Sequence, residues 1–179
     1  MATTKWNIDR AHSAIQFKAK HLMITTVTGN FTVYDASVET QGDDFSTAKI
    51  EFTADTASVS TGNEQRDGHL KSADFFDAET HPKMRFVSKQ IERAKGEGNY
   101  TLTGDLTIRD ITKRVTLDAE FGGIMKDPWG NIKSGFTLET KINRKDWGLV
   151  WNNLLESGGV LVSEDVKILC DIQLAKGMN

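Results

Sequence analysis

Apolar and polar residues alternate along most of the chain. In residues 13–21, SAIQFKAKH, the side chains of Ile15 and Phe17 share one face, whereas those of Lys18 and Lys20 share the other. A period of two residues is typical of a β-strand with one side in water. The same period returns in residues 31–38, 50–54, 84–88, 100–108, 115–121, 132–142 and 166–174. The pattern therefore predicts about eight strands.

Within residues 31–38 the alternation of apolar and polar residues shifts by one position. Phe31 and Val33 are two residues apart, but after Tyr34 the apolar positions move to Ala36 and Val38. A single change of parity in a strand indicates an extra residue or a change of direction. We therefore expect a bulge or a bend near Tyr34.

Short turns separate the predicted strands. They have the sequences QGDD at 41–44, KGEGN at 95–99, RDITK at 109–113 and KDPWGN at 126–131. Short turns join antiparallel neighbours, and no long amphipathic helix is available for parallel crossovers. Closure removes the exposed edges of such long strands. We therefore expect an all-β fold, an eight-stranded antiparallel up-and-down barrel, as a single domain over residues 1–179.

Residues 65–82, QRDGHLKSADFFDAETHP, interrupt the alternation. Thr61 or Asn63 could cap a short helix in the region 64–77. One face of this helix would pack onto the barrel, and its residues would be Leu70, Ala73 and Phe76.

The histidines in this stretch do not form a recognisable catalytic or metal motif. His69 and His81 are twelve residues apart, which is not a metal-ligand spacing. A hydrolase arrangement of Ser72, His69 and Asp74 is weak, because such triads are assembled from distant segments and the chain has no GxSxG motif. We expect no metal, no cofactor and no catalytic residue here, and a structural role for the stretch.

Composition excludes several classes of protein. The net charge of −3 and the pI near 5.8 provide no basic field for nucleic acid. The single cysteine, Cys170, excludes an internal disulfide. The chain begins without the features of a secretory signal and has no apolar run of about 18 residues. We expect a cytoplasmic protein, or a periplasmic or secreted one if a leader has been removed.

Four stretches carry a specific resemblance that runs from about Trp6 to Leu174. They are WNIDRAHSAIQFKAKHL, RDGHLKSADFFDAETHPKMRFVS, LTGDLTIRDITKRVTL and NRKDWGLVWN followed by GGVLVSEDVKI. The resemblance is to the signatures of the YceI-like family of lipocalin-like, polyisoprenoid-binding proteins. It implies an extended barrel around an apolar tunnel for an isoprenoid or other long-chain amphiphile. The resemblance also makes a homodimer plausible.

The inward stripes supply candidate residues for the wall of such a tunnel. These are Phe17, Phe31, Phe52, Phe86, Leu102, Leu106, Phe136 and Leu138. Each of them could equally be ordinary core, because the side chains of an eight-stranded barrel can fill its interior.

Other candidates lie near the predicted ends of the barrel. His21 ends an apolar stripe and could bind a ligand head group or simply be hydrogen-bonded at the rim. Trp147 and Trp151 are four residues apart, so they would share a face if their segment were helical, as packing or as a lid. Arg144 could pair with Asp146 beside them.

The favoured function is binding, transport or sequestration of a long-chain lipid without catalysis, with transient membrane contact. A chain of ten to twenty carbons gains roughly 8–16 kcal/mol on burial, so apolar walls suffice. One rival is a lipid-modifying enzyme with His21, His69 or His81 as general base. A second rival is a stress protein that binds a fatty acid or its amide, and a third is a structural protein whose barrel is filled by its own side chains.

Overall fold

The computed structural model describes residues 2–156 and 158–177. Strands make up most of this part of the chain. The strands are β1 (Thr3–Ile8), β2 (Ala14–His21), β3 (Thr25–Phe31), β4 (Tyr34–Gln41), β5 (Asp44–Asp55), β6 (Val59–Ser60), β7 (Lys83–Arg93), β8 (Asn99–Ile108), β9 (Ile111–Lys126), β10 (Ile132–Asn143) and β11 (Asp165–Lys176). The helices are α1 (Glu64–Lys71) and the 3₁₀ turns η1 (Arg10–His12), η2 (Thr56–Ser58) and η3 (Arg144–Trp147).

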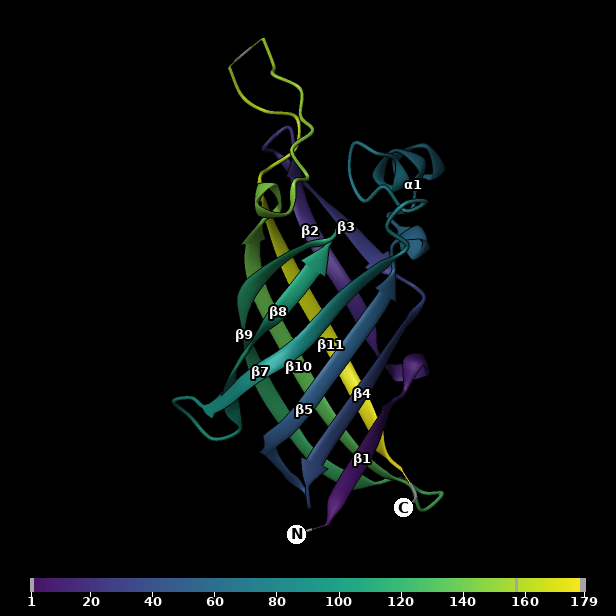
Figure 1. The fold of residues 1–179 in the computed structure, drawn as a ribbon, viewed down its shortest axis with the longest axis vertical. Coiled ribbons are helices and arrows are strands. Elements are labelled where there is room, and N and C mark those ends of the chain that lie inside the picture. The colour runs from purple at the N-terminus through teal and green to yellow at the C-terminus, as the bar shows by residue number, and fades with distance from the viewer. Residues whose placement is uncertain (1, 157, 178–179) are drawn as a thin grey trace.

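The strands close into an antiparallel barrel of eight strands (Figure 1). The sheet runs β1-β4-β5-β7-β8-β9-β10-β11, and it closes where β1 pairs with β11. The other three strands, β2, β3 and β6, extend the barrel at one end. Strand β2 pairs with β11 beyond the part of β11 that pairs with β1, β3 pairs with β2, and β6 pairs with β3. The predicted all-β, up-and-down barrel is therefore confirmed.

The predicted break near Tyr34 is present. Strand β3 ends at Phe31 and β4 begins at Tyr34. Phe31 and Tyr34 are both buried although they are three residues apart, whereas Val33 between them is 52% exposed. In an unbroken strand they would point to opposite faces. The two-residue interruption therefore lets both rings face the interior.

An aromatic cluster, which we call the plug, fills the end of the barrel near the two termini. Its members are Trp6, Phe45, Phe121 and Phe136. The Phe45 ring lies 5.0 Å from Trp6 and 4.8 Å from Phe136, measured between centroids. The indole nitrogen of Trp6 donates to Thr40 Oγ1 at 3.0 Å, which satisfies a polar group that is buried there. Aromatic rings therefore pack against one another across this end of the barrel.

Helix α1 lies near the opposite end (Figure 1). Asn63 caps it by accepting a hydrogen bond from the Arg66 amide at 2.9 Å, as one of the two predicted caps. The helix ends at Lys71 and not near residue 77, because Ser72 has an extended backbone and its hydroxyl donates to the His69 carbonyl at 2.6 Å. Turns follow, in which Phe76 is buried and Ala73 is exposed. The prediction that Ala73 lies on a helical face packed onto the barrel is thus wrong.

The segment that carries Trp147 and Trp151 is not a helix of two turns. Only residues 144–147 form a 3₁₀ turn, and Gly148 ends it with a left-handed backbone (φ 79°). Beyond it the chain is an extended loop, in which the side chain of Asn152 binds both the amide and the carbonyl of Val162. The expectation that the two tryptophans share a helical face is therefore wrong.

Among residues 2–156 and 158–177, none of the helices combines the length and the apolar character that a bilayer-spanning helix requires.

Candidate functional site

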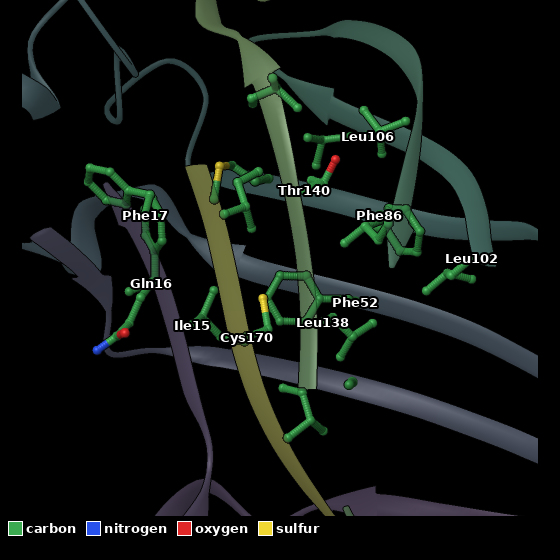
Figure 2. A pocket seen from close by; sticks show the side chains of 18 of the residues that line it. Ile15, Gln16, Phe17, Phe52, Phe86, Leu102, Leu106, Leu138, Thr140 and Cys170 are labelled. Carbon is green, nitrogen blue, oxygen red and sulfur yellow. The ribbon is translucent and has the colours of Figure 1, made fainter. Parts of the chain in front are cut away.

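The barrel encloses a cavity of about 290 Å³ above the plug. Side chains from different strands point into a common space, as Phe52, Phe86 and Leu138 do in Figure 2. Almost every group on the wall is aliphatic, aromatic or sulfur-containing, and the polar residues at its boundary are few. The interior is therefore partly hollow and apolar, which suits a hydrocarbon and not a polar substrate.

Most of the predicted site residues border this cavity. They are Phe17, Phe31, Phe52, Phe86, Leu102, Leu106, Phe136, Leu138, Arg144 and Trp147. The alternation predicted the Phe and Leu residues of this set to point inward, whereas Arg144 and Trp147 were expected at an end of the barrel. The structure brings them together from several strands and the turn η3. Their contact with a ligand stays a prediction.

His21 and Trp151 do not border the cavity. His21 lies at the end of β2, opposite Thr25 and beside Val162. Trp151 packs edge-on against His69, with ring centroids 4.5 Å apart. The alternation in the sequence indicates the face of a strand but not the height along the barrel, so the stripe that holds His21 continues past the cavity.

Two segments cover the end of the cavity opposite the plug, and we call their side chains the cap. The cap residues are Leu70, Phe75, Phe76, Trp147 and Leu149. Arg109 joins the two segments, since its guanidinium donates to the carbonyls of Phe75 at 3.0 Å and Gly148 at 3.4 Å. Residues 65–82 thus contribute packing groups to the end of the barrel.

Trp147 is the most buried part of the cap, with 2% of its surface exposed. Its indole nitrogen donates to the Leu106 carbonyl at 2.9 Å, so the ring is fixed to strand β8. The ring therefore belongs to the core and to the cavity wall at once.

Arg144 is 5% exposed and fastens the loop after η3 to the barrel. Its guanidinium donates to the carbonyls of Ser163 at 2.9 Å, Leu149 at 2.6 Å and Val162 at 3.4 Å. Its expected pairing with Asp146 is absent from the ion pairs of the described residues, and Asp146 is exposed. Burial lowers the pKa of Arg144, but a guanidinium keeps its proton at neutral pH. Backbone carbonyls make the hydrogen bonds to this charge, and the carboxylate of Glu164 adds a favourable electrostatic interaction.

The histidines of the cap region are paired with carboxylates. His69 Nε2 lies 2.9 Å from Asp74 Oδ2, and His81 Nδ1 lies 3.2 Å from Asp110 Oδ2. The hydroxyl of Ser72 binds a backbone carbonyl and not the His69 ring, so the Ser-His-Asp arrangement is not formed. No group of three or more His, Cys, Asp or Glu within the described ranges could hold a metal ion.

Cys170 faces the cavity from β11 (Figure 2). Burial raises the pKa of its thiol to about 12. The thiol is therefore neutral at physiological pH and acts as another apolar group on the wall.

Two strand glycines shape the wall although the alternation does not single them out. Gly29 lies opposite Phe17, and Gly104 lies beneath the ring of Phe86. A Cβ atom at either position would come within 2.4 Å of the ring. Glycine in a strand often marks such a close approach, so the signal is present in the sequence.

We predict that Gly104→Ala destabilises the fold by about 1–3 kcal/mol, the usual cost of overpacking. The added Cβ would meet both the Phe86 ring and the Val87 carbonyl, which lies at 2.6 Å and cannot swing aside. Urea denaturation would measure the loss. Gly135→Ala on β10 is the control, because its nearest atom is a carbonyl oxygen at 3.9 Å. Equal stability of the two variants would contradict the prediction.

Comparison with known proteins agrees with this architecture. The model of the YceI-like domain matches residues 6–174. The UPF0312 protein SAS2572 of Staphylococcus aureus (strain MSSA476) is 42% identical over 92% of this chain and 93% of its own. The Campylobacter jejuni YCEI protein is similar in structure, with a TM-score of 0.76, 34% identity, and coverage of 89% of this chain and 90% of its own.

A polyisoprenoid-binding domain from Saccharophagus degradans shares the fold at a TM-score of 0.68. It is 14% identical and aligns over 96% of this chain and 98% of its own. A likeness at that identity concerns the fold alone. The YceI-like family model, in contrast, matches nearly all of the chain. The S. aureus relative is 42% identical to this chain, against 14% for the S. degradans domain. The chain therefore belongs to the YceI-like family.

Proposed function

We propose that this protein binds a long-chain amphiphile, such as a polyisoprenoid, with the apolar tail in the barrel, and carries or sequesters it without catalysis. The observation that supports this most is the cavity of about 290 Å³ with an almost wholly apolar wall. The S. degradans domain, which is described as polyisoprenoid-binding, supports the same class of ligand. A barrel filled by its own side chains does not fit the hollow interior.

The size of the cavity limits the length of tail that it can hold. An apolar cavity of about 150 Å³ accepts benzene, with six carbons, so a cavity of 290 Å³ accommodates about twelve. Burial of twelve methylenes contributes about 10 kcal/mol, against an association cost of about 4–15 kcal/mol. A longer isoprenoid would require the plug or the cap to move, or part of its tail to stay outside.

Solvent extraction of purified protein followed by mass spectrometry tests the proposal. We expect a long-chain lipid in the extract. A series of saturated fatty acids and prenyl alcohols, titrated by calorimetry, would then show affinity that rises with tail length and levels off near a dozen carbons. An empty extract together with no heat of binding for any tail would overturn the proposal.

Filling the cavity should abolish binding without unfolding the barrel. Leu138→Trp places an indole in the hollow space, so we expect at least a tenfold loss of affinity for a twelve-carbon tail. The melting temperature should change little, because the ring enters a void. Thr137→Trp, on the exposed face of the same strand, is the matched control and should bind like the wild type. Unchanged affinity in Leu138→Trp would place the ligand elsewhere.

A lipid-modifying enzyme is the second candidate, and one observation favours it. The pair of His69 and Asp74 lies beside the cap, with the His69 ring 5.1 Å from Phe75. A histidine oriented by a carboxylate can act as a general base. Turnover of a bound lipid that is lost in His69→Gln would decide for the enzyme, and a chemically unchanged lipid after long incubation would decide for the carrier.

A homodimer remains a prediction of the family resemblance. Light scattering during size-exclusion chromatography, with and without a bound lipid, would measure the mass and test it.

A further inference from the structure

Exposed apolar side chains gather at the capped end of the barrel, on two neighbouring segments that we call the tip. The β2–β3 turn carries Leu22, Met23 and Ile24, which are 36%, 58% and 76% exposed. The loop after η3 carries Val150 and Leu154, which are 60% and 85% exposed. The Leu22 amide donates to the Leu161 carbonyl at 2.9 Å, so the two segments lie side by side (Figure 1). Together they form an apolar surface in water.

The backbone of the β2–β3 turn is unfavourable for the residues that it carries. Leu22 (φ 54°) and Met23 (φ 61°) are both left-handed, and the Ile24 amide donates to the His21 carbonyl at 3.1 Å. A β-turn whose two central residues are both left-handed favours Asn-Gly at those positions. The β8–β9 turn has the same conformation at Arg109 and Asp110, but there the residues are polar. Strained residues that display apolar side chains to solvent indicate a function outside the fold.

The β2–β3 hairpin, one of the two segments of the tip, carries charges of one sign only. Residues 14–32 contain no Asp or Glu, in a chain that has 25 of them, whereas they contain Lys18, Lys20 and His21. Neither lysine takes part in an ion pair with a described residue, and Lys20 Nζ donates only to Thr26 Oγ1 at 3.1 Å. Residues 148–155, GLVWNNLL, are uncharged, whereas the exposed Glu156 follows them on the same loop and Glu164 at the loop's end is paired with Lys145. The tip is thus an apolar surface with a basic margin on the side of the β2–β3 hairpin.

The tip is continuous with the cavity wall. Leu149 and Val162, which border the cavity, belong to the same loop as the exposed Val150 and Leu154. The plug closes the other end of the barrel, so the tip lies at the end where a tail could enter. Apolar insertion combined with basic residues is the pattern by which proteins bind the surface of anionic membranes.

We infer that the tip docks on a lipid bilayer that contains anionic head groups, with Leu22, Met23 and Ile24 inserted and Lys18 and Lys20 near the head groups. The inference rests on the proposed lipid-binding function, because that function gives the protein a reason to dock on a bilayer. Docking itself, however, does not require a ligand in the cavity.

Sedimentation with vesicles of phosphatidylcholine and phosphatidylglycerol in equal parts tests the inference. The double change Leu22→Asn and Met23→Gly removes both apolar groups and installs the preferred turn residues. We expect binding to fall at least tenfold, since two buried apolar side chains are lost. The melting temperature should rise by about 2–5 °C as the turn is relieved. Because the two effects have opposite signs, misfolding cannot mimic the result.

Further variants localise the docking. Lys18→Gln with Lys20→Gln should reduce binding to the level measured on pure phosphatidylcholine. Met125→Ser with Trp129→Ser should bind like the wild type, since these residues are 72% and 83% exposed but lie at the plugged end. Loss of binding in that control, or wild-type binding by the Asn-Gly variant, would overturn the inference.

A tail-binding titration without vesicles keeps the two proposals separate. A wild-type protein that binds a twelve-carbon fatty acid in solution but does not sediment with vesicles would overturn membrane docking and leave the carrier function intact. A protein that sediments with vesicles through the tip but binds no tail would support docking and contradict the carrier function.

Discussion

Trp147→Ala should lower the free energy of unfolding by about 3–5 kcal/mol, the range for removal of a large aromatic side chain from a core. Only 2% of this residue is exposed, and its ring borders the cavity as part of the cap. The change would also leave the Leu106 carbonyl without the indole donor that now lies at 2.9 Å. Urea denaturation monitored by circular dichroism would measure the loss.

Two comparisons separate the roles of the Trp147 ring. Trp147→Phe keeps an aromatic ring but removes the donor, so it should cost about 1–3 kcal/mol. Trp129→Ala changes a tryptophan that is 83% exposed and should stay within about 0.5 kcal/mol of the wild type. A loss below about 1 kcal/mol in Trp147→Ala would contradict its place in the core.

Binding by the same variant tests Trp147 as part of the ligand wall. Measured at a temperature where the variant is folded, affinity for a fluorescent long-chain ligand should fall at least tenfold, because the wall loses an aromatic surface. Unchanged affinity would leave Trp147 with a structural role only.

The strands and their closure could be predicted because alternation is a local signal. The stripe in residues 13–21 and the parity change near Tyr34 are each decided by immediate neighbours, and the structure has a strand and a break at those places. The wall residues followed from the same parity. What the pattern could not indicate is whether the interior is hollow, since that depends on how the strands are tilted and staggered around the barrel.

The loop after η3 could not be predicted, because distant bonds determine it. Trp147 and Trp151 have helical spacing, but the left-handed Gly148 between them ends the turn. The loop is then held by the Arg144 guanidinium and by Asn152, whose partners lie up to 19 residues away in the sequence. No local pattern shows a side chain that binds carbonyls of a distant segment. The same limit made Asp146 look like the natural partner of Arg144.

Arg144→Met should therefore destabilise the fold strongly, because the Arg144 side chain holds the loop after η3 to the barrel. We expect a loss of about 2–4 kcal/mol in the free energy of unfolding, since the carbonyls of Leu149, Ser163 and Val162 would lose a charged donor in a buried place. The loop should also be cleaved faster by protease, because these bonds hold it to the barrel. Arg144→Lys should recover only part of the loss, since an ammonium cannot reproduce the planar fork that reaches three carbonyls.

The neighbouring Lys145 is the matched control for this prediction. Lys145 is exposed, and its ammonium lies 3.2 Å from Glu164 Oε1 in a surface ion pair. Such pairs contribute about 0–1 kcal/mol, so Lys145→Met should change stability little and leave the loop resistant to protease. If Arg144→Met were no more destabilising than Lys145→Met, the bonds to the three carbonyls would not be what fastens the loop. The position of the loop at the capped end of the cavity would then depend only on the packing of apolar side chains such as Trp147 and Phe75.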